Sequence, residues 1–293
     1  MNQFKTVALL GLLSALLTTI SYTVIGGPGG ALFGIVLAAI MNLGSWYFSD
    51  RIALAAYGAR PVTPQQAPGV YRIVQRLAHR AGLPMPAVYV IPGSAANAFA
   101  TGRDPEHAAI ALTQGIVNLL PEDELAGVIA HELSHIYNRD TLTQAVAATI
   151  AGAISFLSQM VSYSLWFGGF SRDKDGPNPL SLLMTVFLAP VAATVIQLSL
   201  SRTREFAADA QAATLTGNPR ALANALQRLE MNARRMPMMG NPAFAPLLII
   251  NAVPRQLLSR LFSSHPSTGD RVQRLLELER TLSAQPWGTA LPV

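Results

Sequence analysis

Long apolar runs stand out at the start of the chain. Two of them, Thr6 to Ile25 and Ala31 to Phe48, flank the turn-forming sequence GGPGG at residues 26–30. A transmembrane helix needs about 20 mainly apolar residues to cross a hydrocarbon layer of about 30 Å, so each run is long enough to span a membrane. The short linker predicts a tight membrane hairpin. Because the first run exceeds the apolar part of a typical signal peptide and another run follows at once, we interpret it as an uncleaved anchor.

Two further apolar runs lie in the middle of the chain and predict a second membrane hairpin. The first extends from Leu142 to about Phe167 and contains glutamine and serine residues that would make its inward face polar. The second, Leu180 to Leu200, contains Pro190, which membrane helices tolerate. The pattern therefore predicts a mainly α integral membrane protein with four transmembrane helices.

The remaining segments alternate polar and apolar residues in the way that is typical of a globular domain. Residues 51–141 contain an amphipathic helical pattern that begins at Pro68, followed by three short strand-like runs. These runs are Ala87–Ile91, Asn97–Gly102 and Ala108–Leu112. Residues 201–293 have the pattern of helices. We expect residues 1–50 to form the first hairpin, and residues 142–200 to be an insertion between the two halves of one domain.

Composition favours residence in a membrane and limits the chemistry. Only 13% of the residues are charged, against about 25% in a soluble domain, and the mean hydropathy is +0.33. The chain has no cysteine, so disulfides and thiolate nucleophiles are excluded and any metal must be held by His, Asp or Glu. The net charge of +5 would suggest nucleic acid as a partner, but the arginines are spread along the chain without basic runs. We expect no nucleic acid partner, and assign the positive charge to membrane topology and anionic headgroups.

Basic residues next to the apolar runs predict the orientation in the membrane. Lys5 precedes the first run, Arg51 and Arg60 follow the second, and Arg202 and Arg204 follow the fourth. The linker at residues 26–30 is uncharged, whereas two basic residues inside the second hairpin weaken the bias slightly. By the positive-inside rule, both termini and both long segments lie in the cytoplasm, with the chain crossing the membrane several times.

The sequence HELSH, which begins at His131, carries the strongest chemical signal. Residues four apart on a helix are neighbours, with Cβ atoms about 5–6 Å apart, so His131 and His135 point the same way. Their imidazoles can share one zinc ion at about 2.0–2.1 Å. Glu132 is turned away from the metal nitrogens, yet it can reach a water held by the zinc and take its proton as that water attacks a carbonyl. The motif follows Pro121 and three acidic residues, which is typical of a helix start.

A catalytic zinc ion keeps three protein ligands and one open position, so a third ligand is needed. Asp140, five residues past His135, falls off the zinc-facing side of the helix. Glu205 is the better candidate, because it lies in a helical segment that continues from the fourth apolar run. Asp209, one turn later on the same face, would accept a hydrogen bond from a ligating histidine and fix its tautomer.

Four motifs together resemble a known family. HELSHIYNRD, SRTREFAADAQAA, NAFATG and SSHPSTGDR, set among four apolar runs, are similar to those of the HtpX heat-shock membrane metalloproteases, which are related to the CAAX prenyl endopeptidases and to gluzincins. The resemblance implies a cytoplasm-facing zinc endopeptidase of the bacterial inner membrane that acts in the stress response. It further implies a mainly helical, gluzincin-like α+β domain with a small β-sheet, and substrates that are damaged or misassembled membrane proteins or unfolded proteins.

The resemblance also implies roles for individual residues. It gives one zinc ion per chain held by His131, His135 and Glu205, with Glu132 as the catalytic base, and it implies that an edge strand holds the substrate through backbone hydrogen bonds. The matching strand residues are Asn97, Ala98, Phe99 and Ala100. His265 would hydrogen-bond the tetrahedral oxyanion. Asp209, Asp140 and Arg271 would lie near the ligands.

Other classes of protein remain open at this point. An intramembrane zinc protease also carries His-Glu-x-x-His, but its third ligand is usually an aspartate in a distal span, and here the motif lies outside the core of a span. An inactive zinc-binding scaffold or chaperone would not need Glu132 together with all three ligands. A transporter is suggested by glutamines within the apolar runs, although no run interior contains an ionisable residue. The sequence leaves open whether the chain forms a homo-oligomer, and whether the apolar loop Met236 to Pro246 is a lid or dips into the membrane.

Overall fold

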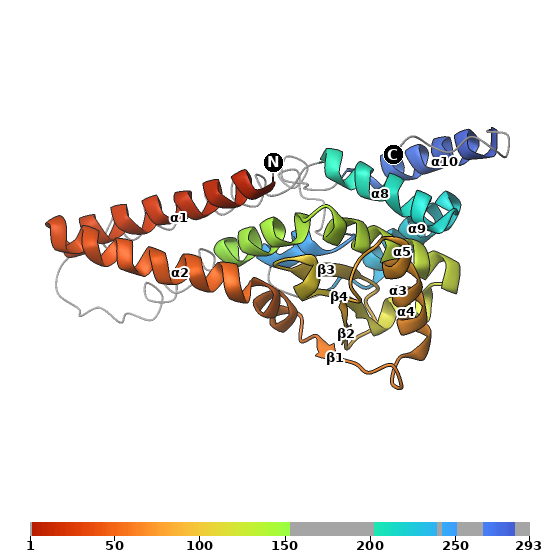
Figure 1. The fold of residues 1–293 in the computed structure, drawn as a ribbon, viewed down its shortest axis with the longest axis horizontal. Helices are drawn as coiled ribbons and strands as arrows, with labels where there is room; N and C mark the ends of the chain where they lie inside the picture. Colours follow the sequence, from red (N-terminus) through yellow and green to blue (C-terminus); the bar gives the residue numbers. More distant parts are fainter. Residues whose placement is uncertain (1, 153–201, 239–241, 251–265, 285–293) are drawn as a thin grey trace.

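The computed structural model describes residues 2–152, 202–238, 242–250 and 266–284 of the chain (Figure 1). Its first feature is a hairpin of two long helices, α1 (Asn2–Ile25) and α2 (Gly27–Ala56). Figure 1 shows them side by side, extending away from the sheet. Of the helices in the described part of the chain, α2 is long and apolar enough to cross a membrane; the corresponding apolar run of α1, Thr6–Thr19, is shorter.

The turn of this hairpin is tighter than the sequence predicts. Gly26, with φ 93°, is the residue between the helices, and α2 begins at Gly27 with a proline in its first turn, where no backbone donor is needed. A positive φ at this position favours glycine. The helix also continues past Phe48, where the prediction ended, as far as Ala56.

Close packing and a polar contact hold the two helices together. A Cβ atom on Gly34 would lie 2.6 Å from the Cα atom of Thr18, so only glycine permits this approach. The side-chain amide of Asn42 donates to the carbonyl oxygen of Leu10 at 3.2 Å and to the hydroxyl of Ser14 at 2.8 Å. Small residues at the contact and side-chain hydrogen bonds between helices are the means by which membrane helices associate.

The second predicted hairpin falls largely outside the described residues. Residues 140–152 are helical, which covers the start of the third predicted span, and the fourth, Leu180 to Leu200, lies wholly outside them. Four spans and their orientation therefore stay predictions.

A small mixed sheet forms the centre of the rest of the molecule. Its strands are β1 (Arg60–Pro61), β2 (Ala87–Ile91), β3 (Ala98–Gly102) and β4 (Ala108–Thr113). They lie in the order β1-β2-β4-β3, in which β2 and β4 are parallel and the other two pairs are antiparallel. The three predicted strands are confirmed, and β3 is an edge strand. The two-residue β1 was not predicted.

The sheet is buried on both faces. Alternate residues of a strand point to opposite faces, and Ile110 and Leu112 belong to a buried cluster with helices α3 (Pro68–Arg80) and α5 (Glu122–Tyr137). Phe99 and Ala111 belong to a second cluster. Its other members come from α1, the end of α2, residues 146–151 and residues 243–248. The membrane hairpin is therefore part of the core that covers the sheet.

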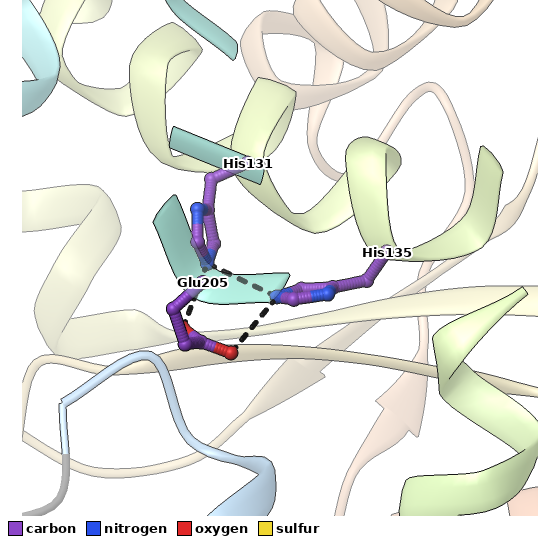
Figure 2. Close-up of side chains that lie close together, drawn as sticks. All are labelled: His131, His135 and Glu205. Carbon is purple, nitrogen blue, oxygen red and sulfur yellow. Dashed lines mark hydrogen bonds and ion pairs between the residues drawn. The ribbon is translucent and has the colours of Figure 1, made fainter. Parts of the chain in front are cut away.

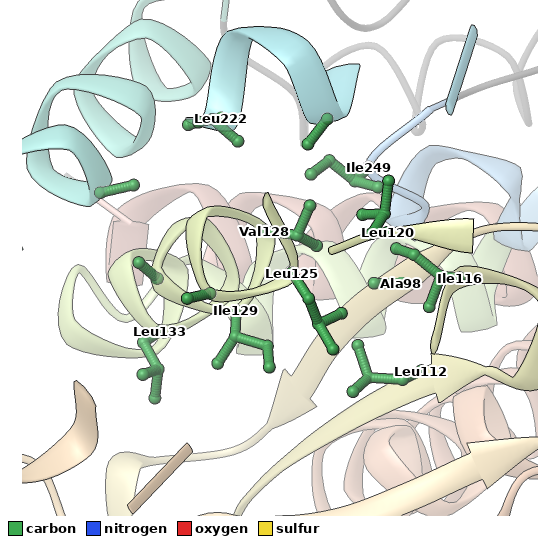
Figure 3. Close-up of a cluster of buried hydrophobic side chains, with 14 of the residues drawn as sticks. Ala98, Leu112, Ile116, Leu120, Leu125, Val128, Ile129, Leu133, Leu222 and Ile249 are labelled. Carbon is green, nitrogen blue, oxygen red and sulfur yellow. The ribbon is translucent and has the colours of Figure 1, made fainter. Parts of the chain in front are cut away.

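The remaining helices pack on α5, on the sheet or on one another. They are α4 (Gln114–Leu119), α8 (Arg202–Thr216), α9 (Pro219–Arg235) and α10 (Thr268–Ala284), with short 3-10 helices at Pro105–His107 and Pro242–Leu247. Helix α9 crosses α5 closely, because a Cβ atom on Gly127 would lie 3.1 Å from the backbone of Leu222. Figure 3 shows the apolar side chains of α5 between the sheet and Leu222. Every residue of α5 from Glu124 to Ile136 is buried.

Candidate metal centre

Helix α5 carries the HELSH motif into the interior. Glu122, Asp123 and Glu124 lie in its first turn, where carboxylates stabilise the positive end of the helix dipole. The helix ends at Tyr137, and Arg139, with φ 55°, reverses the chain. Asp140 then begins the next helix. This turn brings the Asp140 carboxylate back toward the motif, so its position does not follow the geometry of a continued α5.

Three side chains from two helices meet at one point in the interior (Figure 2). The Nε2 atoms of His131 and His135 lie 3.2 Å apart. Glu205, in α8, places one carboxylate oxygen 3.6 Å from Nε2 of His131 and the other 3.6 Å from Nε2 of His135. All three side chains are buried, with at most 5% of any residue exposed. They form the one group of at least three metal-binding side chains found among the described residues.

The spacing and the donor types of these side chains suit a zinc ion. Ligand atoms about 2.0–2.1 Å from a tetrahedral centre lie about 3.3–3.4 Å from one another. The Nε2–Nε2 separation of 3.2 Å agrees with this geometry. Each Nε2 has a different Glu205 oxygen at 3.6 Å, so the carboxylate is placed to complete a site for one ion. Two imidazoles and one carboxylate also supply the donor types that zinc prefers, and they leave a fourth position for water.

Two aspartates contact the metal-binding histidines at Nδ1, the ring nitrogen that does not face the metal site. An Asp209 oxygen lies 2.9 Å from Nδ1 of His131, and an Asp140 oxygen lies 3.2 Å from Nδ1 of His135. When each Nδ1 donates its proton to a carboxylate, the lone pair of Nε2 stays free and points to the place where a metal ion would bind. Both histidines are thereby held in the tautomer that binds a metal.

Two arginines complete this arrangement. The buried guanidinium of Arg271 donates two hydrogen bonds to Asp209, at 2.8 and 2.6 Å. Arg204 donates to Asp140 at 3.1 Å. On its position in the sequence, Arg204 is interpreted above as a topological charge after a span. Its contact with Asp140 was missed, although its position next to Glu205 was a signal that could have indicated it.

The protonation equilibria of the site follow from burial and from these contacts. Burial raises the pKa of the Glu132 carboxyl, and nearby Glu205 adds to that rise, whereas the two histidines and a hydrogen bond from the Ala100 N–H oppose it. The pKa of Asp209 is lowered to about 2, because the charge and hydrogen bonds of Arg271 outweigh the burial that would raise it. Asp209 therefore remains ionised, and the raised pKa makes Glu132 a better proton acceptor than an exposed carboxylate, as a general base requires.

The predicted substrate strand lies beside the centre. Asn97 is buried immediately before β3, which contains Ala98, Phe99 and Ala100. The outer edge of this strand is in contact with residues 249–250, because the Ile249 N–H donates to the carbonyl oxygen of Ala98 at 3.0 Å. The sequence carried no signal for this contact. His265, the predicted oxyanion donor, lies outside the described residues, so its role stays a prediction.

A buried His-His-Glu set, with a second glutamate next to the first ligand, defines the class of metal-dependent hydrolases. The chain belongs to peptidase family M48, whose model matches residues 64–279. It is accordingly a metalloprotease, and its HtpX relatives together with the apolar helix α2 indicate a membrane protein.

Relatives along the whole chain support this assignment. A protein named Protease HtpX homolog from Trichormus variabilis is 69% identical over 96% of this chain and 98% of its own. Homologues of the same name from Nostoc punctiforme and Pyrococcus furiosus are 67% and 47% identical, over 98% and 94% of this chain and 99% and 95% of their own. The chain is thus a member of the HtpX-like metalloproteases, as the resemblance predicted.

A solved structure supports the fold. The crystal structure of S. mikatae Ste24p superposes with a TM-score of 0.51 at 22% identity, covering 90% of this chain and 62% of that one. The chain therefore spans about 62% of the length of that structure. At this identity the match supports the arrangement of helices and sheet alone.

Proposed function

We propose that the chain is a zinc-dependent endopeptidase that hydrolyses peptide bonds of damaged or misassembled membrane proteins and unfolded proteins on the cytoplasmic side of a bacterial inner membrane. The observation that carries the proposal is the convergence of His131, His135 and Glu205 on one buried point beside the buried Glu132. The relatives named Protease HtpX homolog support the activity.

The roles of the residues follow from their contacts. A zinc ion held there would lower the pKa of its water to near 7 and polarise the scissile carbonyl. Glu132, whose pKa is raised by burial, accepts the proton of the attacking water and returns it to the leaving amine. Asp209 and Asp140 keep the two histidines in the ligating tautomer and orientation.

The surface of α2 supports the membrane location. Its exposed side chains include many large apolar residues and then three consecutive aromatic residues, Trp46, Tyr47 and Phe48. Aromatic belts are typical of membrane–water interfaces. The guanidinium of Arg103, in the β3–β4 connection, lies 4.9 Å from the Tyr47 ring, and that of Arg51 lies 5.7 Å from the Phe48 ring. These contacts favour a membrane boundary close to the sheet, and the basic residues that flank the spans favour its cytoplasmic side.

Zinc content and casein cleavage test the proposal when they are measured together. The full chain is purified in detergent under chelator, and zinc is added back to the wild type, Glu132→Gln and Glu205→Ala. The exposed Glu106→Gln serves as the matched control. We expect zinc-dependent cleavage by the wild type and the control. Glu132→Gln should keep its zinc and lose about 10²–10⁴-fold in rate, the usual contribution of a general base. Glu205→Ala should lose both zinc and activity.

Two outcomes would contradict the proposal. Stoichiometric zinc without cleavage in the wild type would favour the inactive scaffold or chaperone. Full metal content and activity in Glu205→Ala would show that the third ligand lies elsewhere.

A further inference from the structure

A segment of the chain itself lies along the outer edge of β3. We call residues 242–250 the strap; it consists of the 3-10 helix Pro242–Leu247 and the three residues that follow. The strap is buried, with Ile249 2% and Ile250 8% exposed. It lies more than a hundred residues from β3 in sequence, so the contact is a long-range one.

The edge that the strap contacts faces the metal centre. Alternate residues of an antiparallel strand direct their N–H and C=O groups to opposite sides. The carbonyl oxygen of Asn97 accepts from the Thr113 N–H of the β4 side, so Ala98 and Ala100 face outward. The Ala100 N–H contacts the carboxylate of Glu132, and the Ala98 carbonyl oxygen accepts from Ile249. One edge of β3 therefore serves both the proposed general base and the strap.

All four backbone polar groups of Ile249 and Ile250 are bound. The Ile249 N–H donates to Ala98 at 3.0 Å, and the Ile249 carbonyl oxygen accepts from Arg271 at 3.2 Å. The side-chain amide of Asn97 donates to the Ile250 carbonyl oxygen at 2.8 Å and accepts from the Ile250 N–H at 3.4 Å. On the side of the strap these contacts use backbone groups alone, which is how a protein holds an extended peptide of varied sequence.

The groups that hold the strap also belong to the metal centre. Arg271, which binds the Ile249 carbonyl oxygen, also binds Asp209, the partner of His131. Ile249 is therefore connected to the metal-binding His131 through the side chains of Arg271 and Asp209. If the chain is the proposed protease, the backbone of a substrate would take the position of the strap, along the edge of β3 and beside the zinc-bound water.

We infer that the strap is an internal pseudosubstrate, which occupies the edge of β3 and leaves it when an extended apolar peptide takes its place. The inference rests on the proposed function, and it states how access to that active site is regulated. A closed site of this kind restrains a protease until a competing segment is present. The equilibrium between the two occupants then sets the fraction of active molecules.

The side chains of the strap indicate the chemistry of the competing peptide. Ala243, Phe244, Leu247 and Leu248 are at most 6% exposed and lie in the cluster that contains Leu9 and Leu13 of α1 and residues of α2. A segment that replaces the strap must cover the same apolar surface, so it must itself be apolar. Such segments are exposed by membrane proteins that have failed to assemble.

Thiol labelling tests displacement directly, because the natural chain has no cysteine. Leu248→Cys is introduced into the full chain with Glu132→Gln, so that added peptide is not consumed. The rate of maleimide labelling is measured alone, with a blocked decapeptide of alternating leucine and threonine, and with the same peptide carrying glutamate for leucine. Ala225→Cys, buried in α9, and Met231→Cys, 57% exposed, are the slow and fast controls.

The apolar peptide should accelerate labelling of Leu248→Cys by about tenfold or more, since the open state is a minor species of at most about 10% before peptide is added. The acidic peptide and both controls should show no acceleration. An unchanged rate at Leu248→Cys with saturating apolar peptide overturns the inference.

An activity measurement gives a second, independent readout. Leu248→Ser weakens the packing of the strap without touching its backbone contacts, and we expect a higher kcat/KM for casein through a lower KM. Leu226→Ser, at another buried position, in α9, should lower activity in proportion to the loss of folded protein. A parallel loss in Leu248→Ser would contradict the inference. If Leu248→Ser does not fold, the labelling result decides, and absence of zinc-dependent cleavage in the wild type counts against the proposed function instead.

Discussion

The two faces of the small sheet are buried equally well by very different parts of the molecule. Ile110, on one face, packs in a cluster with α3, α5 and α9 and is 0% exposed. Phe99, on the other, is also 0% exposed, in a cluster built from α1, α2, residues 146–151 and the strap. The first face supports the helix that binds metal, and the second faces the membrane hairpin. The hairpin is therefore as much a part of the core as the catalytic helix.

The strongest test of this comparison is to remove one large side chain from each face. We expect Phe99→Ala to lower the free energy of unfolding by about 3–5 kcal/mol and Ile110→Ala by about 2–5 kcal/mol, because each leaves a cavity in a closely packed core. Denaturant unfolding in detergent micelles measures both. A cost below about 1 kcal/mol for Phe99→Ala alone would show that the membrane-side cluster is loosely packed.

A smaller effect is expected when a side chain of the metal centre is changed without a change in packing. Asp140→Asn keeps the shape of the side chain but weakens its hold on His135. We expect zinc affinity to fall about 10–100-fold, as is usual when a partner of a ligating histidine is changed. Competition with a fluorescent chelator measures the affinity. The half-buried Asp104 is the control: Asp104→Asn should bind zinc as the wild type does, and an equal loss there would contradict the assignment.

The smallest effect compares two phenylalanines. Phe33 lies on the outer surface of α2 and is 54% exposed, so its ring has few protein contacts to lose. Phe33→Ala should change the unfolding free energy by less than about 0.5 kcal/mol in detergent, in contrast to Phe99→Ala. A cost as large as that of Phe99→Ala would mean that this surface of α2 packs against another part of the protein.

Local signals explain which parts of the fold the sequence could predict. The helix start at Pro68, strand Ala87–Ile91 and the HELSH helix each depend on spacing within a few residues, and all three are confirmed. Glu205 could be proposed because a zinc site needs a third ligand, and the structure brings it to His131 and His135.

Long-range contacts explain what the sequence could not predict. The two residues of β1, Arg60 and Pro61, form a strand only because β2 lies beside them. The contact between Asn97 and Ile250 joins residues that are 153 positions apart, and neither has a local pattern that indicates the other. The burial of Phe99 by the hairpin likewise depends on how the chain folds back on itself.

The continuity of α2 has a mechanical consequence. Its 30 residues span about 45 Å, whereas a hydrocarbon layer is about 30 Å thick. About 15 Å of the same helix thus extends beyond the layer, and its end, at Ala53 and Leu54, is locked into the core beneath the sheet. In the proposed membrane arrangement, this one continuous helix would set the distance between the metal centre and the lipid. In that arrangement hydrolysis would be confined to one level above the membrane, and a peptide bond would have to reach that level before it could be cleaved.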